Sequence, residues 1–239
     1  MSDEPSERNA AARQLPLALR FPPDQRLETF IAAPGGSIAQ LRELARAEGA
    51  LYLQGVEGVG KTHLALATCA AAEATGRHAA YLPLQAAHGR LADALQALEG
   101  NALVAVDGLD AIAGARADEV ALFDFHNRAR SAGIGLLYTA RVAPAQLPLV
   151  LPDLRSRLSQ CTRIVLDPLD EAARREVLRE RAQRRGLAVD EAAYDWLLRR
   201  VGRDLAGLTS LLDRLDRASL AAKRRITVPF LRELLDPER

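Results

Sequence analysis

Short apolar runs alternate with longer amphipathic stretches from residue 50 onward. The apolar runs have the length of buried strands, and they cover residues 51–53, 79–84, 103–106, 136–138 and 164–166. The stretches between them have helical periodicity and cover roughly 61–75, 88–98, 118–131 and a short segment that begins near Asp153. Runs separated by roughly ten or more residues require crossover connections, which favour parallel pairing. The pattern therefore predicts an α/β fold, a doubly wound parallel sheet with helices on both faces.

The pattern changes on both sides of this region. Residues 1–13 are polar and alanine-rich, which indicates a flexible tail, and a helix is expected over 37–47 with Ser37 as its N-cap. After Pro168 the amphipathic stretches are all helical and cover 170–185, 190–201, 204–222 and 228–235, with Asp170 and Asp190 as expected N-caps and Gly186 and Gly202 at helix ends. We expect three parts, which span residues 1–24, 25–168 and 169–239.

The composition narrows the class of protein. The 239 residues include 32 basic and 31 acidic side chains, which excludes a general basic coat for nucleic acid but leaves room for a local patch. Two cysteines are too few for a disulfide scaffold, and the four histidines lack metal-ligand spacing. The N-terminus has no signal-peptide apolar core, and no apolar run reaches the roughly 18 residues of a membrane span. We therefore expect a reduced, cytoplasmic protein.

The segment Gly55-Val56-Glu57-Gly58-Val59-Gly60-Lys61-Thr62 is a complete G-x-x-x-x-G-K-T motif. It follows the predicted strand 51–53 and opens a predicted helix, which is the context that phosphate binding requires. The glycines let successive amides face phosphate oxygens, Lys61 reaches the β- and γ-phosphates, and the Thr62 hydroxyl ligates Mg²⁺. Lys61 is one of only two lysines in an arginine-rich chain, which strengthens the prediction of a nucleotide site.

An apolar strand ends in Asp107, which is the expected carboxylate partner of the phosphate loop and would hold Mg²⁺ through water. Many nucleotidases of this class carry a second acid directly afterwards, which orients the attacking water. Here that position is Gly108, and Asp110 is out of register. We expect hydrolysis by the protein itself to be weak or absent, so that the nucleotide serves mainly as a structural ligand.

Several motifs together resemble the AAA+ domain of the bacterial replication-initiator (DnaA) family. They are the phosphate loop, the Asp107 strand, residues 136–139 and the box 151–158, and the helical tail with residues 202–207 resembles the lid of that family. The resemblance covers roughly 25–235 and implies a P-loop AAA+ sheet domain followed by an all-α lid subdomain. The sequence ends where the initiator carries its helix-turn-helix DNA-binding domain. A DnaA-like AAA+ module without that domain is similar to the Hda subfamily.

The hexamer Gln14-Leu15-Pro16-Leu17-Ala18-Leu19 is similar to the Q-L-x-L-x-L clamp-binding peptide of the Hda subfamily. An extended peptide with a leading amide and alternating leucines can dock in a shallow apolar groove. The resemblance assigns clamp contacts to Gln14, Leu15, Leu17 and Leu19. A short edge strand that folds back on the core is the alternative interpretation.

The resemblance also assigns roles to single residues. Arg157 matches the box that supplies an arginine finger to a neighbouring subunit, and a helix-surface arginine is the alternative. Arg203 matches the lid arginine that senses phosphates, and a solvated salt bridge near Asp204 is the alternative. Phe30 and Ile31, with Leu27, fall where the family lines its adenine pocket, although ordinary core packing would equally explain them. The expected nucleotide-binding set is Gly55, Gly58, Val59, Gly60, Lys61, Thr62, His63, Asp107, Arg203, Phe30 and Ile31.

The resemblance implies a regulatory nucleotide-binding protein. With ADP or ATP and Mg²⁺ bound, it would bind the DNA-loaded sliding clamp (the polymerase β subunit) and use Arg157 to stimulate hydrolysis of DnaA-bound ATP, preventing re-initiation. Its partners would be DnaA and the clamp, and it would reach DNA only through the clamp. No membrane partner is expected, and a homo-oligomer is compatible with the resemblance. The alternatives are an AAA+ helicase loader or remodelling ATPase, which would carry an acid after Asp107, and a P-loop kinase, which would need its own substrate pocket.

Overall fold

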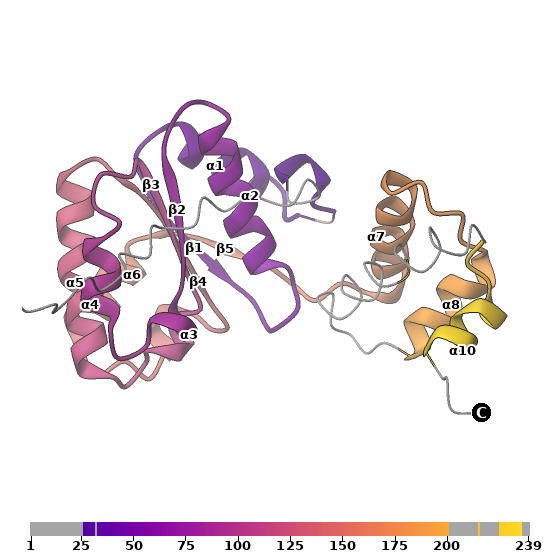
Figure 1. Cartoon of the computed structure of the whole chain (residues 1–239). Coiled ribbons are helices and arrows are strands. Elements are labelled where there is room, and N and C mark those ends of the chain that lie inside the picture. The colour runs from indigo at the N-terminus through magenta and orange to yellow at the C-terminus, as the bar shows by residue number, and fades with distance from the viewer. Residues whose placement is uncertain (1–25, 32, 201–214, 216–224, 236–239) are drawn as a thin grey trace, which may run out of the picture.

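The computed structural model describes residues 26–31, 33–200, 215 and 225–235. They contain a five-stranded parallel sheet and a separate group of helices near the C-terminus (Figure 1). The strands are β1 (Ala50–Gln54), β2 (Ala79–Pro83), β3 (Leu103–Asp107), β4 (Gly135–Ala140) and β5 (Thr162–Val165). Their order in the sheet is β2-β3-β4-β1-β5, so the chain crosses over between neighbouring strands. The predicted α/β class and parallel pairing are confirmed.

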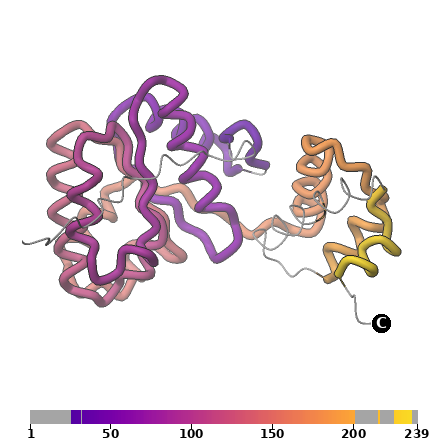
Figure 2. Tube along the Cα trace, viewed as in Figure 1, coloured from indigo at the N-terminus to yellow at the C-terminus, as the bar shows by residue number. Residues whose placement is uncertain are grey.

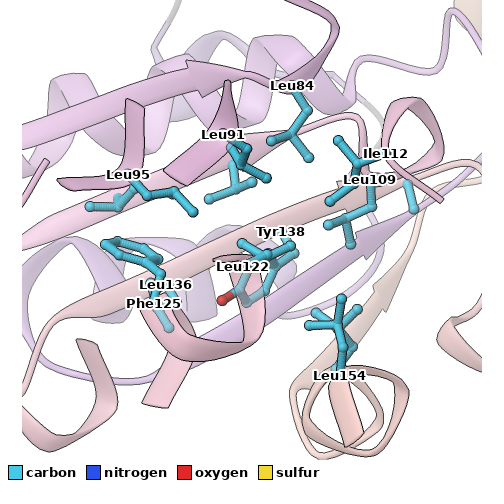
Figure 3. Close-up of a cluster of buried hydrophobic side chains, with 14 of the residues drawn as sticks. Leu84, Leu91, Leu95, Leu109, Ile112, Leu122, Phe125, Leu136, Tyr138 and Leu154 are labelled. Atoms are coloured by element: carbon cyan, nitrogen blue, oxygen red, sulfur yellow. The ribbon is translucent and has the colours of Figure 1, made fainter. Parts of the chain in front are cut away.

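Helices cover both faces of the sheet. The helices of the sheet domain are α1 (Ser37–Arg46), α2 (Lys61–Glu73), α3 (Leu84–Ala87), α4 (Leu91–Gln96), α5 (Arg116–Ser131) and α6 (Pro152–Ser159). Alternate strand residues point to opposite faces, so β1 sends Leu51 and Leu53 towards α1 and α2 and sends Tyr52 towards α5 and α6. Figure 3 shows the core on the face that Tyr52 enters. There Leu91 of α4, Phe125 of α5 and Leu154 of α6 converge on the sheet. The α2 and α6 helices therefore lie on opposite faces.

Several predicted element ends and one predicted cap differ from the structure. The predicted strand 79–84 is one residue too long, because Leu84 begins the short helix α3. The predicted helix 88–98 is too long, because Gly89 has a φ of 76° and α4 covers only Leu91–Gln96. Ser37 is not an N-cap: Gly36 holds that position with a φ of 78°.

Ser37 is instead the first helical residue of α1. Its hydroxyl donates a 2.6 Å hydrogen bond back to the Pro34 carbonyl, so it stabilises the preceding turn rather than the helix amides. Leu41, Leu44 and Ala45 are buried on one face of α1, as the periodicity predicts.

The C-terminal helices form a small core of their own, apart from the sheet (Figure 2). They are α7 (Glu171–Arg184), α8 (Glu191–Arg200) and α10 (Val228–Leu235). The Asp170 side chain caps α7 by accepting the Ala173 amide at 2.7 Å, as predicted. Asp190 precedes α8, and its carboxylate pairs with Arg225 at 2.8 Å. Gly186, with a φ of 67°, follows α7 as expected, whereas Gly202 and the predicted helix 204–222 lie outside the described residues apart from Leu215.

Within the described ranges, no helix combines the length and the apolar character needed to cross a bilayer.

A buried histidine lies on α5 and faces the sheet. His126 is only 6% exposed, and its Nδ1 lies 2.9 Å from the hydroxyl of Tyr138 on β4. Burial, together with the positive charges of Arg157 and Arg130, lowers the pKa of His126 to about 4. The imidazole is therefore neutral in the folded protein at neutral pH.

The burial of His126 predicts that the folded protein becomes less stable as the pH falls. The pKa of His126 in the folded chain lies below the value of about 6.5 in the unfolded chain, so the unfolded chain binds the proton first as the pH falls. We expect the free energy of unfolding to fall by about 2 to 3 kcal/mol between pH 6.5 and 4 through this residue, as measured by urea unfolding. His126→Asn should flatten that slope, and the same substitution at the exposed His88 should leave it unchanged. An equal slope in the wild type and the His126 variant would contradict the assignment.

Candidate nucleotide-binding site

The phosphate-loop sequence forms a tight loop between β1 and α2. Gly58 and Gly60 have φ angles of 80° and 98°, a region that favours glycine. A Cβ on Gly60 would lie 2.6 Å from the ring of Phe30, and one on Gly55 would lie 2.6 Å from the Leu166 carbonyl. Backbone conformation and close approach therefore both require glycine here.

Lys61 begins α2 and turns back over this loop. Its ammonium donates hydrogen bonds to the carbonyls of Gly55 and Val56, at 2.7 and 2.8 Å. Burial lowers the pKa of Lys61, while the carboxylates of Asp110 and Asp107 oppose the shift. No side chain caps the amides at the start of α2, so a cation and free helix amides face the same loop. This arrangement suits the oxygens of a phosphate.

The Asp107 carboxylate accepts hydrogen bonds from three hydroxyl groups. Thr62 at the start of α2 donates at 2.8 Å and Tyr81 on β2 donates at 2.7 Å, both to Oδ2. Thr139 at the end of β4 donates to Oδ1 and accepts the Gly108 amide at 2.9 Å. Parallel strands end at one edge of the sheet, which brings these residues from β2, β3 and β4 together.

The same donor set fits a magnesium ion bound with nucleotide phosphates. Because the Thr62 hydroxyl gives its proton to Asp107, its oxygen lone pairs point away from the carboxylate and can face a cation. Magnesium prefers oxygen ligands and retains waters, which a nearby carboxylate such as Asp107 can orient. Thr62 and Asp107 therefore fit a Mg²⁺ ion bound together with a nucleotide.

Tyr81 is a site residue that sequence reasoning missed. Burial and the neighbouring Asp107 charge raise the pKa of Tyr81 well above its usual value, so the phenol stays protonated and remains a donor. Its only signal in the sequence is its place in the strand before the Asp107 strand. Recognising its role requires knowing that β2 and β3 are neighbours in the sheet.

The position after Asp107 carries no side chain. Gly108 has a φ of 85° and leads into a short 3₁₀ turn over Leu109–Ala111. The Asp110 carboxylate in that turn accepts the Arg141 amide at 2.9 Å. The Arg141 guanidinium in turn pairs with Glu57 of the loop at 3.0 Å. Asp110 is thus held against the end of β4.

The residues assigned to an adenine pocket differ in their surroundings. The Phe30 ring covers Gly60 and lies 5.6 Å from the His63 ring, which places both aromatic rings beside the phosphate loop. Ile31 is half-buried next to Phe30. Leu27 and Val59 are buried in the core between α1, α2 and the sheet, so both serve packing. Arg184 of α7 donates to the Thr29 carbonyl at 3.3 Å and so joins the C-terminal helices to this segment.

Arg157 lies on α6, on the sheet face opposite α2, and is not part of the chain's own phosphate loop. Its side chain is exposed and makes no ion pair within the described part of the chain. Its neighbour Arg155 differs, because it is half-buried and donates to the Leu149 carbonyl. Arg203 and the hexamer from Gln14 to Leu19 lie outside the described residues.

Comparison with known proteins bears on the fold of the chain. Residues 170–235 match the family described as the Hda lid domain. The structure is similar to domain III of the replication initiation protein DnaA from Thermotoga maritima, with a TM-score of 0.75, 20% identity, and coverage of 91% of this chain and 98% of that one.

Two further solved structures are similar. AMPPCP-bound DnaA from Aquifex aeolicus has a TM-score of 0.66 and 19% identity over 81% of this chain and 65% of that one. The RuvB Holliday junction branch migration motor of Thermotoga maritima has a TM-score of 0.61 and 19% identity over 89% of this chain and 72% of that one. The chain thus has a DnaA-like AAA+ fold followed by a helical lid domain, as predicted.

The geometry at Asp107 predicts a role for Tyr81 in metal-dependent binding. Tyr81→Phe removes one of three donors that orient the carboxylate, and loss of such supporting contacts typically weakens metal sites about tenfold or more. We expect calorimetric titration to show about tenfold weaker ADP binding in the presence of Mg²⁺ and unchanged binding in EDTA. Tyr52→Phe is the matched control, because that buried hydroxyl donates to Val142 instead. An equal loss with and without Mg²⁺ would exclude a role through the metal.

Proposed function

We propose that this chain, which joins a DnaA-like AAA+ fold to an Hda lid domain, is a regulatory inactivator of the bacterial replication initiator DnaA. The observation that carries the proposal is the position of Arg157. It is exposed and without an ion pair in the described ranges, and it lies on α6, on the sheet face opposite α2. An arginine placed in this way is available to a nucleotide held by another subunit.

The chain's own nucleotide acts as a structural ligand in this proposal. Lys61, the loop glycines and Thr62 hold the phosphates, Thr62 and Asp107 hold Mg²⁺, and Phe30 and Ile31 border the base. Because Gly108 offers no carboxylate to orient water and Asp110 is tied to Arg141, bound ATP would turn over slowly and ADP would persist. The AMPPCP-bound DnaA from Aquifex aeolicus supports nucleotide binding by this fold.

Arg157 supplies the regulatory step. When two AAA+ modules meet, its guanidinium would reach the γ-phosphate of ATP on DnaA and stabilise the negative charge that develops during phosphoryl transfer. Hydrolysis would end the active state of the initiator and so prevent re-initiation.

The segment from Gln14 to Leu19 would tether the protein to the DNA-loaded sliding clamp. Binding at the clamp raises the effective concentration of Arg157 near DnaA on the same DNA. This arrangement also explains how a chain with a charge of only +1 works at DNA without a basic coat.

A remodelling ATPase is the second candidate, favoured by the similarity to the RuvB motor. Such an enzyme needs rapid hydrolysis of its own ATP, and the absence of a side chain at Gly108 argues against it.

Arg157→Ala tests the central step. We expect the variant to stimulate DnaA ATP hydrolysis about 10³-fold less or worse, since an arginine finger is worth about 10³ to 10⁵ in rate. The measurement is release of phosphate from ATP-DnaA with clamp-loaded DNA. Arg46→Ala, an exposed arginine on α1, is the matched control and should retain full stimulation. Undiminished stimulation by the Arg157 variant would refute the mechanism.

Gln14→Ala tests the tether. Loss of the amide hydrogen bonds should weaken clamp binding about tenfold, as measured by surface plasmon resonance on immobilised clamp. Ala18→Ser, at a position between the leucines, should bind as the wild type does. Equal affinity of the Gln14 variant and wild type would rule out the hexamer as the clamp ligand.

A further inference from the structure

Two consecutive carboxylates are buried in the first turn of α5. Asp118 is 5% exposed and Glu119 is fully buried. A buried carboxylate is costly unless hydrogen bonds satisfy it, so the partners of each side chain indicate what it holds in place. The two side chains bind the main chain of two different loops.

Glu119 holds the segment that leads into α6. Its Oε1 accepts the amides of Gly114 and Val150, at 2.7 and 3.1 Å, and its Oε2 accepts the amide of Leu151 at 2.7 Å. Leu151 is the residue before α6, and its carbonyl accepts the Arg155 amide in the first turn of that helix. A single carboxylate therefore fixes the point where α6 begins.

Buried Leu154 and Leu158 hold the body of α6 against the sheet, whereas Glu119 binds the amides at its entry. No side chain of Leu151 can cap the helix, and the Arg155 guanidinium reinforces the same segment by donating to the Leu149 carbonyl. Arg157 lies further along α6 and forms no ion pair in the described ranges, so the placement of α6 sets the point from which its side chain reaches out. A shift of the entry segment would move Arg157 with it.

We propose that Glu119 is a positioning residue for Arg157, acting through the entry of α6. The inference rests on the proposed function and deepens it, because it names the buried group that sets the geometry of the arginine finger. Effective catalysis requires close placement of reacting groups, and a displacement of about 1 Å can cost 100-fold in rate.

Asp118 provides a matched contrast within the same helical turn. It is also buried, but its Oδ2 accepts the Gly89 amide at 2.9 Å, in the turn between α3 and α4. Removing its charge should affect the same turn of α5 while leaving the amides at the entry of α6 with their partner.

The experiment compares Glu119→Gln, Asp118→Asn and Arg157→Ala in the full chain. Glutamine has nearly the same shape as glutamate, but its NH₂ group cannot accept a hydrogen bond, so at least one of the three amides loses its partner. Stimulation of DnaA ATP hydrolysis is measured across protein concentrations, together with ADP affinity, thermal unfolding, and hydrogen exchange at the amides of Val150 and Leu151. Glu119→Asp, which keeps the charge but is shorter, serves as a second variant if the first does not fold.

We expect Glu119→Gln to lower the maximal stimulated rate by about 10- to 100-fold, with unchanged half-saturating concentration and ADP affinity, and to speed exchange at Val150 and Leu151. Asp118→Asn should keep the wild-type rate. Full stimulation by Glu119→Gln alongside loss in Arg157→Ala would overturn the positioning role and leave the proposed function intact. Equal losses in the Asp118 and Glu119 variants would also overturn it. Full stimulation by Arg157→Ala would overturn the proposed function itself.

Discussion

The Asp107 carboxylate is the group on which the architecture of the site depends. It accepts hydroxyl donors from α2, β2 and β4, and it lies at the end of β3, so one side chain joins four elements at the same edge of the sheet. A carboxylate with three donors has a defined orientation, which keeps the Thr62 oxygen directed towards the loop. The fold therefore fixes the phosphate loop and the carboxylate proposed to hold Mg²⁺ relative to one another.

Much of this arrangement was predictable because it depends on neighbouring residues in the chain. The loop glycines, Lys61 and Thr62 lie in one segment, and the strand before them and the helix after them follow from local hydrophobic patterns. Asp107 was predictable for a similar reason, as a carboxylate at the end of an apolar strand. Asp170 was predictable as an N-cap because capping involves only the next three residues.

The contributions that sequence reasoning missed come from long-range contacts. Tyr81 reaches Asp107 only because β2 and β3 are adjacent, and an order of β2-β3-β4-β1-β5 cannot be deduced from periodicity. Glu119 looks like an ordinary surface residue at the start of a helix, and only the path of the segment before α6 buries it. The Ser37 prediction is wrong for a local reason instead: Gly36 adopts the capping conformation, and the serine hydroxyl binds the preceding turn.

The contact between Phe30 and Gly60 has an evolutionary consequence. Gly60 is constrained by its own left-handed backbone and by the ring above it, and a smaller side chain at position 30 would relieve only the second constraint. Position 30 can therefore change while residue 60 stays glycine, whereas residue 60 gains little freedom from any change at position 30. Among related proteins, position 30 should therefore vary, whereas position 60 should remain glycine.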